Sequence, residues 1–243
     1  MNSVLLIGAT SDVAIATAHL YAKKGHTIYL AARNLEAAER LASDIQIRFS
    51  VDAKAFELDL MDADTHTSFL ENLDMLPLTT ICFAGYLGEQ EKAAIDWSET
   101  ERIIQTNFTG VVSILNLIAA TYEKNGSGEI AVLSSVAGER GRQSNYTYGA
   151  AKAGLTAYLS GLRNRLFKSG VHVLTIKPGF INTKMTEGLP LPKPLTAQPE
   201  QVAQAVEKGL RKKKNIIYTL WMWKYIMFII RNIPEGIFKK LKL

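Results

Sequence analysis

The chain has 243 residues, of which 47% are hydrophobic and 21% are charged, and its formal net charge is +5. This length and composition suit one α/β domain with a substantial core. The single cysteine, Cys82, excludes an internal disulfide framework and is typical of a reducing compartment. The four histidines lack metal-ligand spacing, so no metal site is predicted. The N-terminus lacks the features of a secretory signal, and we expect a cytoplasmic protein.

The charge is divided unevenly between the body of the chain and its C-terminal part. Residues 208–243 contain ten Lys and Arg against Glu235 alone, a net charge of +9. Residues 1–207 therefore hold 18 basic and 22 acidic residues, a net charge of −4. This asymmetry predicts an anionic surface as the partner of the C-terminal part and argues against general binding of nucleic acid.

Strand-like and helix-like patterns alternate along the whole chain. The predicted elements are strand 4–7, helix 12–24, strand 27–31, helix 35–48, strand 53–58, helix 62–73, strand 79–84, helix 99–122, strand 129–134, helix 148–168, strand 171–177, helix 198–210 and strand 215–220. Alternation at this spacing implies right-handed βαβ units. We therefore predict an α/β fold, with residues 1–243 forming one doubly wound parallel sheet of about seven strands and helices on both faces.

The turn after the first predicted strand has features of a Rossmann-type dinucleotide site. A glycine-rich turn lets the N–H groups of a helix N-terminus meet a pyrophosphate. Gly8 keeps the tight-turn position, but Asp12 occupies the position of close approach to phosphate. A carboxylate is unfavourable there unless it caps the helix and points away. The cofactor contacts predicted in this turn are Gly8, Thr10, Ser11, Asp12 and Val13.

The ends of the second and third predicted strands bear on the choice of cofactor. Residues 31–34 contain no acidic side chain for a ribose 2′-hydroxyl, whereas Arg33 can pair with a 2′-phosphate. We therefore predict NADP(H) in preference to NAD(H), the alternative being that Arg33 is simply solvated. Asp59, followed by Leu60, is placed to meet the adenine edge, and a simple helix cap is an equal alternative.

Three residues in the second half can together move a proton to or from a carbonyl oxygen. Tyr148 and Lys152 are four residues apart and so share one face of a helix, and Ser135 lies thirteen residues before the tyrosine. The Lys152 ammonium is expected to lower the tyrosine pKa from its usual value of about 10. The serine hydroxyl can hold a substrate oxygen. A hydride source is still required, and the nucleotide site would provide it.

These pieces, in this order, resemble the short-chain dehydrogenase/reductase family over most of the chain. The matching segments are the turn 8–14, Asp59, Ala84-Gly85, Asn107, Ser134-Ser135, Tyr148-Gly-Ala-Ala-Lys152 and 178–183. The resemblance implies that Tyr148 is the general acid in reduction and that Ser135 polarises the carbonyl. It implies that Lys152 binds the nicotinamide ribose, and that Asn107 holds a water connecting Lys152 to solvent.

The resemblance also implies further cofactor contacts near the nicotinamide. These are Ala84, Gly85, Lys152, Pro178, Gly179, Ile181 and Thr183. Of these, Ile181 and Thr183 would face the nicotinamide amide. The family's Asn-Asn-Ala-Gly reads Cys-Phe-Ala-Gly at 82–85, and this departure alters the loop beside the cofactor.

Segments 134–142 and 231–241 carry a narrower resemblance, to reductases of decaprenylphosphoryl-2-keto-β-D-erythro-pentose. This resemblance implies a lipid-linked keto-sugar substrate. One alternative is a soluble ketoreductase of a small or acyl substrate. A second is a non-catalytic NADP-binding regulator, although such a protein would have no need of Tyr148.

The last third of the chain adds two predicted functional segments. Residues 180–198, rich in proline, are predicted to be a substrate loop, the alternative being a solvated connector. Residues 216–230 carry one charge and are too short to span a bilayer. Their aromatic residues of interfacial type are Trp221, Trp223 and Tyr225.

Because basic residues flank that stretch, residues 216–243 are predicted to lie at the inner face of a membrane. The alternative is burial in the core or in a subunit interface. The helices 99–122 and 148–168 resemble those that pair in family dimers, which implies a homo-oligomer.

Overall fold

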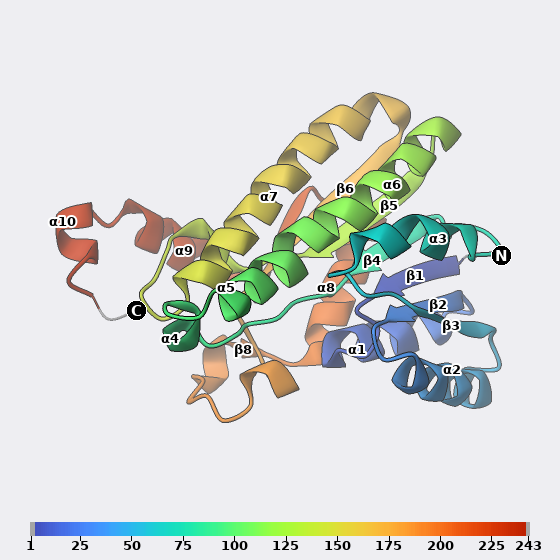
Figure 1. Ribbon diagram of the computed structural model, residues 1–243, viewed down its shortest axis with the longest axis horizontal. Coiled ribbons are helices and arrows are strands. Elements are labelled where there is room, and N and C mark those ends of the chain that lie inside the picture. Colours follow the sequence, from blue (N-terminus) through green and yellow to red (C-terminus); the bar gives the residue numbers. More distant parts are fainter. Residues whose placement is uncertain (1–2, 242–243) are drawn as a thin grey trace.

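A computed structural model describes residues 3–241 and contains a seven-stranded sheet of order β3-β2-β1-β4-β5-β6-β9 (Figure 1). Every neighbouring pair of strands in it is parallel. The strands are β1 Ser3–Ile7, β2 Thr27–Ala32, β3 Ala53–Glu57, β4 Thr79–Cys82, β5 Gly128–Leu133, β6 Val171–Pro178 and β9 Ile216–Thr219. The prediction of a doubly wound parallel sheet is confirmed, because the chain crosses over from β3 at one edge to β4 beside β1.

Helices cover both faces of this sheet. They are α1 Asp12–Ala22, α2 Leu35–Phe49, α3 His66–Glu71, α4 Gln90–Ala93, α5 Trp97–Ile104, α6 Gly110–Asn125, α7 Tyr146–Leu166, α8 Pro199–Arg211, α9 Met222–Asn232 and α10 Glu235–Phe238. One face carries α1, α2 and α8, and the other carries α3, α6 and α7. The last two helices, α9 and α10, extend from one end of the body (Figure 1).

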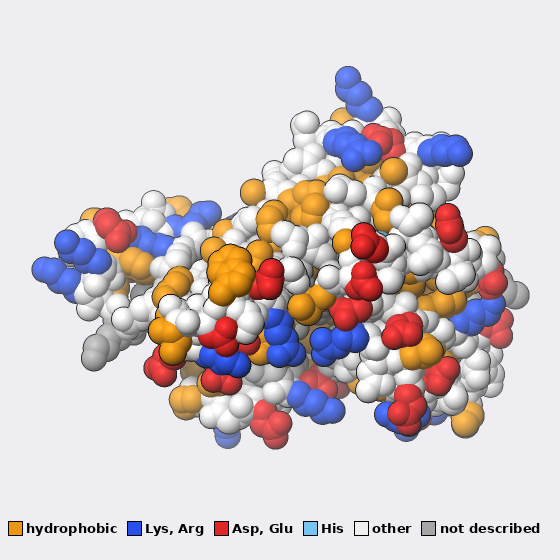
Figure 2. Space-filling model, in the orientation of Figure 1, with side chains coloured by type: hydrophobic (Ala, Val, Ile, Leu, Met, Phe, Trp, Pro, Cys, Tyr) orange, Lys and Arg blue, Asp and Glu red, His pale blue; other side chains and the backbone are white. Residues whose placement is uncertain are grey.

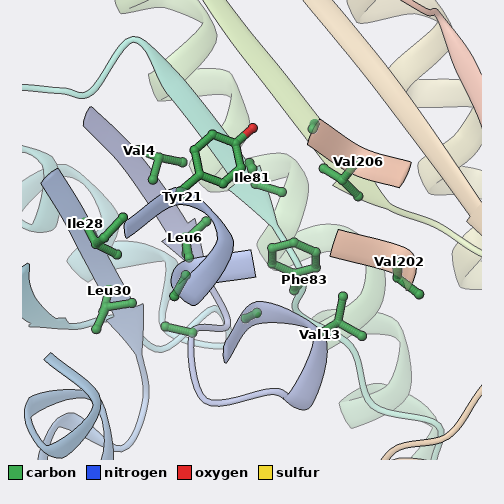
Figure 3. Close-up of a cluster of buried hydrophobic side chains, with 14 of the residues drawn as sticks. Val4, Leu6, Val13, Tyr21, Ile28, Leu30, Ile81, Phe83, Val202 and Val206 are labelled. Atoms are coloured by element: carbon green, nitrogen blue, oxygen red, sulfur yellow. The ribbon is translucent and has the colours of Figure 1, made fainter. Parts of the chain in front are cut away.

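Alternation along the strands produces two separate cores. In β1, Val4 and Leu6 face one side of the sheet, and Leu5 and Ile7 face the other. Figure 3 shows the first core, which contains Val4 and Leu6 of β1 together with side chains of α1 and α8. Strands buried on both faces need continuous apolar runs, which is why these segments could be recognised in the sequence.

The predicted helix 99–122 is interrupted by one π-helical turn, Gln105–Thr109, between α5 and α6. The combined helix Trp97–Asn125 is long and apolar enough to cross a membrane by length and composition. However, Val111, Ile114 and Leu115 are fully buried against the sheet. This helix is therefore accounted for as a core helix of the domain.

The C-terminal part differs from the continuous apolar stretch expected over 216–230. The chain forms the edge strand β9, turns at Leu220 and then forms α9. Before this, the segment 180–198 contains two short strands, β7 Phe180–Ile181 and β8 Thr196–Ala197, which pair in parallel. The loop is thus tied at both ends beside the carboxyl ends of the sheet strands.

Candidate active site

The four residues predicted to be catalytic meet at the carboxyl end of the sheet. Ser135 follows β5, Tyr148 and Lys152 lie on the first turns of α7, and Asn107 lies in the π-helical turn. A cavity of about 160 Å³ is lined by Ser135, Tyr148 and Lys152. Asn107 lies just behind this cavity, because a Cβ atom placed on Gly85 would be 3.3 Å from its Oδ1 and 3.6 Å from Lys152 Nζ.

Lys152 is held by backbone carbonyls. Its side chain is 2% exposed, and Nζ donates a hydrogen bond to Leu133 O at 3.0 Å and approaches Ala84 O at 3.5 Å. Burial lowers the pKa of Lys152 to about 8, because the charged ammonium loses its hydration. The lysine can therefore exchange its proton near physiological pH.

The predicted lowering of the tyrosine pKa is wrong for this structure. Burial raises the pKa of Tyr148 to about 12, and a hydrogen bond from Ser135 only partly opposes it. Lys152 Nζ lies 5.8 Å from the centre of the Tyr148 ring. Since desolvation outweighs the hydrogen bond with Ser135, Tyr148 is a protonated phenol near neutral pH, which suits a proton donor.

Ser135 and Asn107 are fixed by bonds to neighbouring backbone. The Ser135 hydroxyl accepts a hydrogen bond from Ala137 N at 3.0 Å. Asn107 is fully buried and its Oδ1 accepts from Tyr86 N at 3.1 Å, while its Nδ2 donates to the carbonyls of Tyr86 and Ile103 at 2.6 and 2.8 Å. Asn107 therefore ties the loop after β4 to the π-helical turn; its contact with a water stays a prediction.

A second hollow, of about 260 Å³, adjoins the catalytic cavity and contains most of the predicted nucleotide contacts. They are Gly8, Thr10, Ser11, Arg33, Asp59, Leu60, Ala84 and Gly85. Gly8 has φ +76°, and a Cβ atom there would lie 2.8 Å from Ala84 N. The tight turn thus depends on glycine both for its backbone angle and for space. These residues fit a dinucleotide, with Ser11 capping α1 at the phosphate end.

Asp12 and Val13, also predicted to contact the cofactor, do not line this hollow. The Asp12 carboxylate accepts a hydrogen bond from Lys184 N at 2.8 Å, and Val13 is buried in the core. Ser11, not Asp12, caps the helix by accepting a bond from Ala14 N at 3.3 Å. Asp12 thus points toward the loop after β7, which removes the electrostatic objection to a phosphate in the turn.

Two further predicted cofactor contacts, Asp59 and Arg33, follow the ends of β3 and β2. Asp59 accepts a hydrogen bond from Met61 N at 2.9 Å and so shapes its own turn. Arg33 is exposed at the edge of the nucleotide hollow, and Asn34 caps α2 through Ala37 N at 2.9 Å. An adenine contact of Asp59 and a phosphate contact of Arg33 stay predictions.

The remaining predicted contacts line the catalytic cavity rather than the nucleotide hollow. They are Pro178, Gly179, Ile181 and Thr183. Gly179 lies directly against Trp223, because a Cβ atom there would be 1.8 Å from its indole ring. The indole Nε1 donates to Leu195 O at 3.1 Å, and its ring packs edge-on against Phe180. Helix α9 therefore forms a wall of the catalytic cavity.

Among the cavity residues that were not predicted from the sequence are Trp223, Arg142 and Asn145. Trp223 was read only as an interfacial aromatic. The other two fall between Ser135 and Tyr148, and that position was the available signal, since the chain between two catalytic residues must border their cavity. No cluster of His, Cys, Asp or Glu suited to a metal ion occurs within residues 3–241.

Similarity to known proteins identifies the family and the fold of this chain. The model of the short chain dehydrogenase family matches residues 2–193. An uncharacterized oxidoreductase of Mycobacterium tuberculosis is 33% identical over 98% of this chain and 96% of its own length. An uncharacterized oxidoreductase of Streptomyces coelicolor is 32% identical over 99% and 96%. A short-chain dehydrogenase of Sphingobium yanoikuyae, solved with NADPH, has a TM-score of 0.82 at 21% identity, covering 97% of this chain and 98% of that one.

Proposed function

Since this chain belongs to the short-chain dehydrogenase family, we propose that it is an NADP(H)-dependent reductase of a keto group, with Tyr148 as the proton donor. The observation that carries this proposal is the meeting of Ser135, Tyr148 and Lys152 in one cavity beside the nucleotide hollow. That arrangement can place a carbonyl between a proton donor and a bound dinucleotide.

Each polar residue of the cavity has its own role in the reduction. NADPH, held by the residues of the nucleotide hollow, supplies the hydride when bound. Ser135 donates a hydrogen bond to the carbonyl oxygen and polarises it. Tyr148, protonated because of its raised pKa, gives its proton to the oxygen as negative charge develops there. Lys152, with its pKa near 8, can return a proton toward the tyrosine.

The preference for NADP(H) rests on the end of β2. Arg33 is exposed at the rim of the nucleotide hollow, and the neighbouring residues 31–34 contain no carboxylate. A free guanidinium suits a 2′-phosphate, which it can bind with two hydrogen bonds. An acidic residue at this place would have favoured NAD(H).

The substrate we propose is a lipid-linked ketone, and its place of reduction is a membrane surface. Helix α9 has two apolar faces. Trp223 and Met227 pack inward, whereas the outer face is exposed. The outer hydrophobic residues are Trp221, Tyr225, Phe228 and Ile229, with exposed fractions from 59% to 71%. The inner face borders the catalytic cavity, so a bound lipid chain could pass from cavity to bilayer along one helix.

The charge around α9 and α10 favours an anionic bilayer as the occupant of this outer face. Residues 208–243 have a net charge of +9. Figure 2 shows Lys and Arg side chains beside hydrophobic ones on the extension that α9 and α10 form. Exposed aromatic residues together with basic ones suit the interface of a membrane that contains acidic lipid.

Sedimentation with vesicles tests this part of the proposal. The protein should pellet with vesicles of 30% phosphatidylglycerol in phosphatidylcholine, and less so at high salt. The variant Trp221→Ser/Phe228→Ser should stay in the supernatant, whereas the control Ile95→Ser/Trp97→Ser, on an exposed apolar site outside α9, should pellet like wild type. A wild-type protein that stays in the supernatant at low salt, or that covers this face by self-association, contradicts the proposal.

Two other functions remain as competing predictions. A ketoreductase of small or acyl substrates would keep its activity without the outer face of α9. A non-catalytic NADP-binding regulator would not need the complete set of catalytic residues. A homo-oligomer formed through α5, α6 and α7, and a cytoplasmic location, also stay predictions.

The proposed reaction is tested by following NADPH oxidation with a panel of small, acyl and sugar-type ketones. Wild type should oxidise NADPH with at least one of them, and Tyr148→Phe should do so far more slowly. Equal rates in wild type and variant would exclude the proposed role of Tyr148. Binding of NADPH without turnover of any ketone would favour the regulator.

A further inference from the structure

Two polar atoms that border the catalytic cavity lie outside the catalytic set and have no hydrogen-bond partner among residues 3–241. Arg142 Nε and Asn145 Oδ1 are both buried, and neither has a hydrogen bond to any residue in the described part of the chain. Both residues line the cavity that contains Ser135 and Tyr148. Buried polar groups are nearly always hydrogen-bonded, so two such groups in one cavity indicate a ligand that would satisfy them.

Glu139 is the acidic residue whose charge acts on Arg142, but no ion pair joins the two within residues 3–241. Among residues 3–241, those lining the cavity include no Asp or Glu, and the cationic ones are Arg142 and Lys152. The nearby Glu139 pairs with Lys177 at 2.9 Å and accepts a hydrogen bond from the Tyr218 hydroxyl. Arg142 Nη2 contacts only a weak acceptor among the described groups, the thioether of Met227, at 3.3 Å.

The cost of this arrangement supports a role in binding. Burial lowers the pKa of the Arg142 guanidinium, because the charged form is poorly solvated there, and the negative charge of Glu139 only partly opposes this effect. A buried charge that is not fully compensated destabilises the fold. An anionic group brought in by a ligand would offset that cost at the moment of binding.

We propose that Arg142 and Asn145 form a substrate subsite in which the guanidinium binds an oxyanion and the Asn145 carbonyl oxygen accepts a hydrogen bond from a hydroxyl. The substrate class is then a hydroxylated ketone that carries an anionic group such as a phosphate ester. This inference rests on the proposed keto reduction and defines its substrate. It assigns recognition to residues between Ser135 and Tyr148, and leaves polarisation of the carbonyl to Ser135 and proton transfer to Tyr148.

Binding of product-like probes tests the subsite without requiring turnover. Titration calorimetry would compare glycerol 3-phosphate with glycerol, each added to protein saturated with NADP⁺. Wild type should bind the phosphate ester at least about 10-fold more tightly, the scale of a charge-assisted hydrogen bond. Arg142→Gln should lose this preference, and Arg142→Lys should keep part of it. Asn145→Ala should weaken both probes alike.

The control is Arg48→Gln, which removes an exposed guanidinium paired with Asp44 on α2. It should bind both probes as wild type does. Thermal unfolding of each variant shows whether it has folded. Equal affinity of wild type for the two probes, no measurable binding of glycerol 3-phosphate, or full preference retained in Arg142→Gln would overturn the proposal.

Reduction of dihydroxyacetone phosphate and dihydroxyacetone separates this inference from the proposed function. The ratio of their kcat/KM values should favour the phosphate ester in wild type and fall in Arg142→Gln. If wild type reduces no ketone but binds glycerol 3-phosphate through Arg142, the reductase proposal fails and the subsite stands. If both ketones are reduced equally well, the reductase stands and the subsite fails.

Discussion

The two sides of the catalytic cavity are built in opposite ways. On the side of α7 and the π-helical turn, the polar groups are bonded within the protein: Lys152 to backbone carbonyls and Asn107 to the loop after β4. In the segment that leads into α7, Arg142, which contacts Met227 of α9, and Asn145 retain buried atoms without hydrogen-bond partners among residues 3–241. The remaining wall on that side is apolar and includes Trp223 and Phe180.

This difference separates chemistry from recognition. The reacting side is complete before any ligand binds, because its residues hold one another in place. The other side has polar groups that a bound ligand would satisfy and an apolar wall that includes Trp223 of α9. Substitutions on the first side should change the rate of the chemical step, whereas those on the second should change which substrate binds.

The largest effect is expected for Tyr148→Phe, which removes the proton donor and leaves the ring in place. The kcat for ketone reduction should fall by roughly 10²–10⁴-fold, the usual contribution of general acid catalysis. Fluorescence titration should show nearly unchanged NADPH affinity. A fall in affinity as large as the fall in kcat would mean that the two sides are not separable.

The next effect concerns the nucleotide hollow. Arg33→Asp should weaken NADPH binding by about 100-fold, since a charge-assisted pair is lost and a repulsive carboxylate is gained. NADH binding should change little, which provides the internal control. Unchanged NADPH affinity in a fluorescence titration would remove the reason for preferring this cofactor.

Lys152→Met tests the cost of burying a charge on the reacting side. In the unfolded chain the lysine loses its proton near pH 10.5, whereas in the folded protein it does so near pH 8. The unfolded state therefore binds more protons between these values, so the wild-type free energy of unfolding rises with pH across that window. The variant should lack this rise and be more stable at pH 7 by about 3 kcal/mol, the free-energy equivalent of lowering the pKa from 10.5 to about 8.

Urea unfolding of both proteins at pH 7 and pH 10, without nucleotide, measures this difference. The variant should also lose ketone reduction. A variant that is less stable than wild type at pH 7 would show that the bonds of Lys152 to backbone outweigh its desolvation.

The smallest effect is expected at the anchor of α9. Arg140 donates to the carbonyls of Ile230 and Ile233 at 2.7 and 2.6 Å, pairs with Glu235 and packs on Phe238. Arg140→Ala should loosen α9, raising its amide hydrogen-exchange rates by about 10-fold, or roughly 1.4 kcal/mol. Lys224→Ala, on the exposed side of the same helix, is the control. Equal exchange in the two variants would contradict the anchoring role.

Much of the fold was predictable because its strands are buried on both faces. The apolar runs at 4–7 and 79–84 are typical of central strands. The catalytic set could be recognised because the spacing of Ser135, Tyr148 and Lys152 is visible in the sequence. The direction of the Asp12 side chain was not predictable, since its partner Lys184 is 172 residues away. The shift of the Tyr148 pKa was predicted in the wrong direction, because the burial that raises this pKa depends on the whole fold.

For the C-terminal part, the sequence predicted the presence of apolar, aromatic and basic residues but not where each side chain lies. Its aromatic residues suggested one interfacial segment, yet Trp223 enters the catalytic cavity and Trp221, two residues earlier, is exposed. Periodicity could indicate a two-faced helix but not what each face meets. The sequence likewise could not show that Arg142 Nε is buried without a hydrogen-bond partner in the described part of the chain, because this depends on the fold.

The most direct test of the proposed reduction is transfer of deuterium from NADPH that carries deuterium at both hydrogen positions of nicotinamide C4. Wild type would be incubated with a ketone that it reduces, and the alcohol product analysed by mass spectrometry, with Tyr148→Phe run in parallel. We predict one deuterium on the former carbonyl carbon, formed far more slowly in the variant. An unlabelled alcohol, or equal rates of labelling in the two proteins, would contradict hydride transfer assisted by Tyr148.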